Sequence, residues 1–142
     1  MIEEAVTKWH QHLRGELLGG LDELLHEDCV FFSPVVFTPQ KGRAITKLYL
    51  NAASQALPGE KGDPKKPGSG AGSFRYTKKI LMGNQAALEF ETMVDGKSVN
   101  GIDIITCDDA GKITEFRVMI RPLQAVNAVH RQMQSTLESM QS

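Results

Sequence analysis

The sequence predicts a single α+β domain in which helices pack on one face of a curved, mostly antiparallel sheet. Apolar residues recur at helical spacing near the N-terminus, from Arg43 to Ala56 and from Leu123 to about Met140. Between the last two helices, segments rich in Val, Ile, Thr and Phe are separated by short turns that contain Gly and Asp. The length of 142 residues fits one domain, spanning 1–142.

The predicted helices each have one apolar face. The first helix has the stripe Ile2, Ala5, Val6, Trp9 and Leu13. Glu16 to Leu25 is predicted as a second helix or a bent continuation, interrupted by Gly19-Gly20. The inward positions of the helix over 43–56 are Ile45, Leu48, Tyr49, Ala52 and Ala53. Those of the last helix are Leu123, Val126, His130, Met133 and Leu137.

Five strands are predicted, the first from Cys29 to Phe32 and ended by Ser33-Pro34. The other four run from Phe74 to Met82, Ala86 to Val94, Ser98 to Cys107 and Ile113 to Arg121. Alternation gives two of them an apolar face, formed by Leu88, Phe90, Thr92 and Val94 and by Phe116, Val118 and Ile120. The opposite face mixes charged residues with methionine. Pro39 to Gly42 is predicted as a turn.

Residues 57–73 contain the run PGEKGDPKKPGSGAG and are predicted to form a flexible loop. Nothing in this run could bury a core. Two interpretations remain open: an insertion without a further role, or a segment that covers the mouth of a pocket.

Composition argues against several classes of function. The net charge of -1 does not favour a nucleic-acid partner, and no apolar run is long enough to span a membrane. The N-terminal residues do not resemble a secretory signal, so we expect a cytoplasmic protein in which Cys29 and Cys107 are reduced. Neither a metal-ligand spacing nor a phosphate-binding loop is present, so no metal and no cofactor are expected.

Asp103 is the candidate functional residue, because it stands between Ile102 and Ile104 in an apolar strand. Burial of an unpaired carboxylate costs several kcal/mol and raises its pKa. A neutral carboxylic acid can donate a hydrogen bond to a carbonyl or enolate oxygen, whereas an ionised one could act as a general base. The alternative is a structural aspartate that accepts hydrogen bonds or pairs with Arg43, Arg75, Arg121 or a histidine.

The chain resembles the SnoaL-like, nuclear-transport-factor-2-like (NTF2-like) superfamily. The residues that carry the resemblance are LLHEDCVFFSPVV, the helix start at Gly42-Arg43, EFETMVDGK, GIDIITCDDAGKI and VMIRPL. The resemblance implies a cone in which three to four helices pack on the concave face of the sheet. It leaves the activity open, because the superfamily contains isomerases, cyclases, dehydratases and transport factors.

Among these activities, the pattern is most similar to that of the ketosteroid isomerases. In those enzymes a carboxylate before a proline removes a proton, while a helix tyrosine and a protonated aspartic acid hold the enolate oxygen. The matching positions here are Ser33, Trp9 and Asp103, so only the aspartic acid is kept in kind. Because Ser33 cannot act as a general base unaided, steroid isomerisation itself is not expected.

The resemblance also implies a ligand pocket and a subunit interface. Side chains expected to line the pocket around Asp103 are Trp9, Phe31, Ser33, Tyr49, Leu88, Phe90, Thr92, Ile105, Phe116, Val118 and Ile120. We expect a small, largely apolar organic ligand, isomerised, cyclised or dehydrated with the help of Asp103. The alternatives are a non-catalytic binding protein and a protein-interaction module. A homodimer is expected through the outer sheet face, which carries Glu89, Glu91, Met93, Arg117, Met119 and Arg121.

Overall fold

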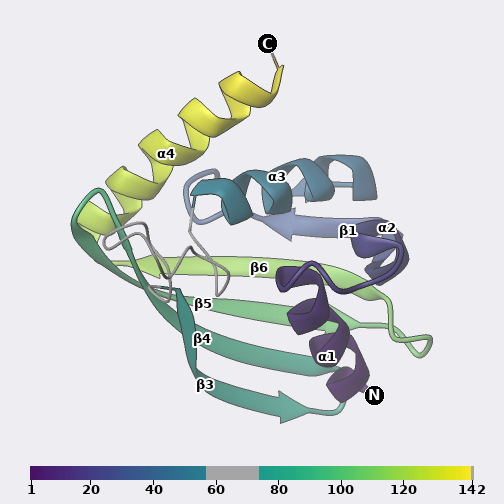
Figure 1. Cartoon of the computed structure of the whole chain (residues 1–142). Helices are drawn as coiled ribbons and strands as arrows, with labels where there is room; N and C mark the ends of the chain where they lie inside the picture. Colours follow the sequence, from purple (N-terminus) through teal and green to yellow (C-terminus); the bar gives the residue numbers. More distant parts are fainter. Residues whose placement is uncertain (57–73, 142) are drawn as a thin grey trace.

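The computed structural model describes residues 1–56 and 74–141, so the loop predicted over 57–73 lies outside the described residues (Figure 1). The α+β class is confirmed, with helices on one face of a curved sheet. In chain order the elements are α1 (Ile2–Leu13), α2 (Gly20–Leu24), β1 (Leu25–Phe32), β2 (Gln40–Lys41), α3 (Arg43–Ala56), β3 (Arg75–Met82), β4 (Gln85–Val94), β5 (Lys97–Cys107), β6 (Ile113–Arg121) and α4 (Leu123–Gln141).

The described strands form one sheet in the order β2-β1-β6-β5-β4-β3. β1 runs parallel to β6, and the other neighbouring pairs are antiparallel. The sheet curves around α1, α3 lies over β1, and α4 packs against β5, β6 and β4 (Figure 1). None of the described helices combines the length and the apolar composition needed to cross a bilayer.

The prediction of a helix from Glu16 to Leu25 was wrong over much of its length. Gly19 and Gly20 have φ values of 81° and 55°, which interrupt the right-handed helical conformation, so α2 begins only at Gly20. Leu25 is already extended, and β1 therefore starts four residues before the predicted Cys29. Part of the predicted turn at 39–42 is the short strand β2, which pairs with β1.

The predicted turns between the later strands are confirmed. Asp95 and Gly96 both have positive φ values, 50° and 72°, as a tight hairpin requires. Asp108 closes the β5–β6 turn, because its Oδ1 accepts hydrogen bonds from the backbone N–H groups of Ala110 and Lys112.

The buried side chains form two clusters on the concave side of the sheet. The larger cluster joins α1, α2 and β1 to the middle strands, and it contains Trp9 and Phe116. The smaller cluster packs α4 on β4 and β5 through Ala125, Ala128 and Val129. The predicted inward face of α4 was therefore partly wrong: Leu123 and His130 are exposed, because α4 approaches the sheet through its small residues.

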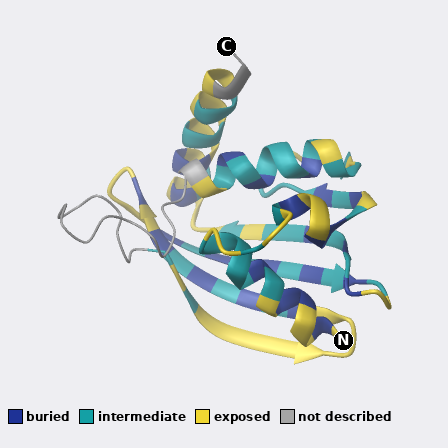
Figure 2. Ribbon diagram, turned by 45° about the vertical axis from the view of Figure 1, so that its right-hand side comes forward, coloured by how far each residue is buried: buried dark blue, intermediate teal, exposed yellow. Residues whose placement is uncertain are grey.

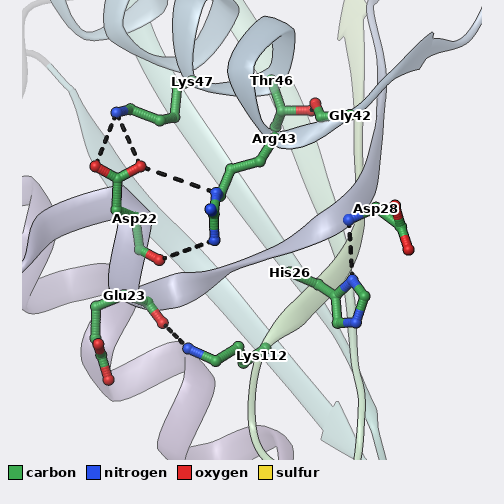
Figure 3. Close-up of polar contacts among 9 residues, drawn as sticks. All are labelled: Asp22, Glu23, His26, Asp28, Gly42, Arg43, Thr46, Lys47 and Lys112. Carbon is green, nitrogen blue, oxygen red and sulfur yellow. Dashed lines mark hydrogen bonds and ion pairs between the residues drawn. The ribbon is translucent and has the colours of Figure 1, made fainter.

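Polar contacts fix α2 against α3 at the rim of the sheet (Figure 3). Lys47 Nζ lies 2.9 Å and 3.0 Å from the two carboxylate oxygens of Asp22. The guanidinium of Arg43 contacts the same residue, with Nε 3.9 Å from Asp22 Oδ1. Lys112 Nζ donates to the Glu23 carbonyl oxygen at 2.6 Å, which ties the β5–β6 turn to α2.

Candidate functional site

Asp103 points to the concave side of the sheet from the middle of β5. The buried positions of this strand alternate, and they include Gly101, Asp103 and Ile105. Only 5% of Asp103 is exposed. Its cross-strand neighbours are Leu88 on β4 and Val118 on β6, which share its face of the sheet. Asp103 is thus a carboxyl group surrounded by apolar strand residues.

Two hydrogen bonds connect Asp103 to the opposite wall of the cone. The hydroxyl group of Tyr76, on β3, donates to Asp103 Oδ2 at 2.7 Å. Trp9 Nε1, on α1, donates to the Tyr76 hydroxyl oxygen at 2.9 Å. The Trp9 indole N–H is therefore used by Tyr76. Three elements that are distant in sequence meet in one hydrogen-bonded chain, Trp9–Tyr76–Asp103.

The arginines considered as partners for Asp103 are engaged elsewhere. Arg43 lies against Asp22, Arg75 forms an ion pair with Glu91, and Arg121 donates to Asn100. Burial raises the pKa of the Asp103 carboxyl from 3.8 to about 7, and the Tyr76 hydrogen bond opposes part of that rise. Asp103 therefore changes its protonation state near neutral pH.

Protonation of Asp103 changes the number of hydrogen-bond donors at this point. When Asp103 is ionised, the pair has one hydroxyl hydrogen, that of Tyr76, and it forms the hydrogen bond to the carboxylate. When Asp103 is protonated, the two side chains carry two protons, and one hydrogen bond between them uses only one. The protonated pair can therefore direct one O–H toward the oxygen of a ligand.

An apolar cavity of about 200 Å³ lies beside this chain, between α3, α4, β6 and the segment that follows β1. Its described lining residues are Phe31, Ser33, Pro34, Val35, Val36, Tyr49, Ala53, Val118, Ile120, Val129, His130, Met133, Gln134 and Leu137. A cavity of about 150 Å³ is enough to hold benzene, so this one fits a ligand of about one ring.

The structure separates the predicted pocket residues into two groups. Five of them line the apolar cavity: Phe31, Ser33, Tyr49, Val118 and Ile120. The others do not line it and are buried in the packed interior: Trp9, Leu88, Phe90, Thr92, Ile105 and Phe116. Asp103 is not part of the cavity lining either, but its cross-strand neighbour Val118 is. Asp103 thus lies beside one residue of the cavity lining, on the same face of the sheet.

Ser33 and His130 are polar residues in the cavity lining, and they differ in what they can do. Ser33 Oγ accepts hydrogen bonds from the backbone N–H groups of Val35 and Val36, at 3.1 Å and 3.3 Å. This serine therefore shapes the turn after β1. His130 extends from the exposed side of α4 to the cavity rim.

Sequence reasoning missed Tyr76. The strand assignment was sound, since β3 begins at Arg75, one residue after the predicted start. Alternation does place Tyr76 on the same face as Phe74, and their rings are 5.2 Å apart. That alternation was the available signal, but only the folded chain shows that the Tyr76 ring reaches across β4 to Asp103.

No group of three or more His, Cys, Asp or Glu side chains among the described residues is arranged to hold a metal ion.

We compared the chain with protein-family models, curated proteins and solved structures. No protein-family model and no curated protein matches the chain. A steroid delta-isomerase structure from Pseudomonas aeruginosa is 29% identical, with a TM-score of 0.81, over 98% of this chain and 93% of that chain. An uncharacterised bacterial protein with a cystatin-like fold from Silicibacter pomeroyi is 27% identical, with a TM-score of 0.68, over 82% of this chain and 73% of that one.

An NTF2-like protein of unknown function from Cytophaga hutchinsonii has the same fold, with a TM-score of 0.59 and 17% identity over 89% of this chain and 95% of its own. The strand order, the helices on the concave face and these similarities agree with the resemblance seen in the sequence. The chain thus has the fold of the NTF2-like proteins, which it shares with the steroid delta-isomerase structure.

Proposed function

We propose that the protein binds a small, largely apolar carbonyl compound in the cone and isomerises, cyclises or dehydrates it with Asp103 as the acid. The observation that carries this proposal is the environment of the Asp103 carboxyl. It is buried, the candidate arginines have other partners, and its hydrogen bond comes from a neutral tyrosine. Ionisation of a carboxyl group in this environment lowers the stability of the fold, so packing alone does not explain why an aspartate stands at this position.

The role proposed for Asp103 is to stabilise negative charge on the ligand oxygen. As a carbon–hydrogen bond beside the carbonyl breaks, electron density moves to that oxygen. The protonated Asp103–Tyr76 pair supplies one O–H donor for it, in surroundings from which water is largely excluded. Trp9 holds the tyrosine hydroxyl in place from the other side.

Access to Asp103 from the cavity passes Val118. Since Val118 lines the cavity and is the cross-strand neighbour of Asp103, a rotation of this side chain would bring a bound ring and the carboxyl together. His130 is the histidine of the described lining and is our candidate to accept the proton from carbon. Ser33, which the resemblance places at the position of the proton-removing carboxylate, is not assigned this role. Its hydroxyl oxygen accepts two backbone hydrogen bonds in the turn.

The similarity to the Pseudomonas aeruginosa steroid delta-isomerase supports chemistry at a carbonyl group. We do not propose a steroid as the substrate, because the described cavity of about 200 Å³ suits a ligand of about one ring, whereas a steroid has four.

The experiment uses a ketone pair of suitable size. Cyclohex-3-en-1-one is incubated with the protein, and its conversion to the conjugated cyclohex-2-en-1-one is followed by ultraviolet absorbance. Binding is measured in parallel by NMR. We expect turnover that declines as pH rises through about 7, because the acid form of Asp103 is required. Asp103→Asn should reduce the rate by about 100-fold while the ketone still binds.

Asp109→Asn is the matched control, since Asp109 is an exposed aspartate in the β5–β6 turn. Its rate should equal that of the wild type. Saturable binding without turnover in the wild type would instead support the alternative, a non-catalytic ligand-binding protein. Absence of saturable binding of either ketone would support a protein-interaction module.

We further propose a cytoplasmic homodimer that associates through the outer sheet face. That face presents Met93 and Met119, which are 46% and 49% exposed, together with charged side chains. A shallow hollow of about 450 Å³ lies on it, lined by Ile80, Ile102 and Met119 among others. Methionine and arginine are enriched at subunit interfaces, and this face carries both. The free, buried thiols of Cys29 and Cys107 are compatible with a reducing compartment.

A further inference from the structure

A further hollow has Tyr76 in its lining. This cationic cleft, of about 360 Å³, lies between α1 and β3. Its described lining residues are Thr7, His10, Arg14, Arg75, Tyr76 and Lys79. Along β3 most residues are exposed, so the cleft opens to solvent at the edge of the sheet (Figure 2).

The charge of the cleft is one-sided. Arg14, Arg75 and Lys79 carry positive charge, and none of the described lining residues is acidic. Because the whole chain has a net charge of -1, this concentration is not a consequence of a basic protein. A cleft lined by one sign of charge raises the local concentration of counter-ions and orients them.

The partners that the two arginines have in this structure lie outside the cleft lining. Arg14 Nε is 3.0 Å from Glu16 Oε2, and an Arg75 guanidinium nitrogen is 3.0 Å from Glu91 Oε1. Both pairs are solvent-exposed, and such pairs contribute little stability. A bound carboxylate or phosphate could therefore recruit either guanidinium without a large loss of folding stability.

The shape of the cleft suits more than an inorganic ion. Its volume falls within the usual range for small-molecule sites, roughly 300 to 1,000 Å³. The His10 and Tyr76 rings meet edge to face, with centroids 5.3 Å apart, and give the cleft an aromatic part of its lining. The cationic side chains and the hydroxyl of Thr7 supply hydrogen-bond donors around it.

We propose that the cationic cleft binds a small organic anion, with its carboxylate or phosphate held by Arg14, Arg75 and Lys79 and its apolar part against the ring of Tyr76. This site is distinct from the apolar cavity and does not depend on the acid chemistry of Asp103. Tyr76 connects the cleft to Asp103, since it lines the cleft and its hydroxyl group donates to the Asp103 carboxyl.

The single tryptophan of the chain makes the proposal measurable. Trp9 donates its indole hydrogen bond to the Tyr76 hydroxyl, so occupation of the cleft should change Trp9 fluorescence. The probes are benzoate, phenyl phosphate, inorganic phosphate and the neutral analogue benzamide. We expect a saturable response to benzoate or phenyl phosphate, weakened by added NaCl, and no comparable response to benzamide. Comparison of benzoate with phenyl phosphate identifies the preferred head group.

The test variant is Arg75→Gln with Lys79→Gln, which should weaken binding of the organic anion at least about ten-fold. The control removes two positive charges elsewhere, as Lys97→Gln with Arg131→Gln, and should bind within about two-fold of the wild type. Asp103→Asn should also bind normally, which distinguishes this proposal from the catalytic one. Equal binding of benzamide, equal affinity in the Arg75/Lys79 variant, or no saturable response to any anion would overturn the inference.

Discussion

Replacement of Asp103 by Asn should make the protein more stable at neutral and alkaline pH. Burial raises the pKa of Asp103 from 3.8 to about 7 in the folded protein, whereas the unfolded chain titrates near the lower value. Between these two values the folded state holds a proton that the unfolded state has released, so the stability of the wild type falls as pH rises. At about 1.4 kcal/mol per pH unit, the loss reaches about 4 kcal/mol above pH 7.

Asparagine removes this dependence because its side chain stays neutral at every pH, while its oxygen can still accept the hydrogen bond from Tyr76. Urea denaturation at several pH values between 4.5 and 9 measures the difference. The stability gained by Asp103→Asn over the wild type should grow by about 3 to 4 kcal/mol from pH 4.5 to pH 8 and then level off. Asp109→Asn, at an exposed site, should show no such growth. A difference that stays constant with pH, or that favours the wild type as pH rises, would refute the reasoning.

Three further changes test other parts of the structure. Tyr76→Phe removes the donor that favours the ionised carboxylate, so the pKa of Asp103 should rise above about 7 in an NMR titration; an unchanged pKa would show that the hydrogen bond has no influence. Gly101→Ala would place a Cβ 2.3 Å from Phe90 Cζ, and this overpacking should cost about 1–3 kcal/mol in urea denaturation, whereas an unaltered midpoint would contradict the close approach. Met119→Glu should convert the proposed dimer to a monomer in light scattering; a wild-type protein that is already monomeric would exclude the interface.

The strand run could be predicted from sequence to within about a residue at each end. Its turns contain residues that are typical of chain reversals. Asp95 and Gly96 have positive φ values, and the Asp108 side chain accepts a hydrogen bond from the backbone of its turn. Alternation then placed Asp103 on the concave face. The helix from Arg43 to Ala56 was predicted with its observed bounds, because a glycine precedes it and its apolar face is continuous.

Other features depend on packing that local patterns do not encode. α4 faces the sheet with Ala125 and Ala128, since small residues allow close approach, whereas the periodicity of its larger apolar residues favoured another face. The contact between Tyr76 and Asp103 joins residues 27 positions apart across an intervening strand. The division between a packed interior and a cavity behind Val118 likewise depends on side-chain volumes in three dimensions.

The pKa of the Asp103 carboxyl, followed by the carbon-13 resonance of its side chain during a pH titration, tests the central claim most directly. Asp103→Asn assigns the resonance by its disappearance. We predict a midpoint near 7, which would mean that a neutral acid is present inside the cone at physiological pH. A midpoint near the ordinary 3.8 would mean that the group is solvated or paired with a cation, and the proposed acid would not exist.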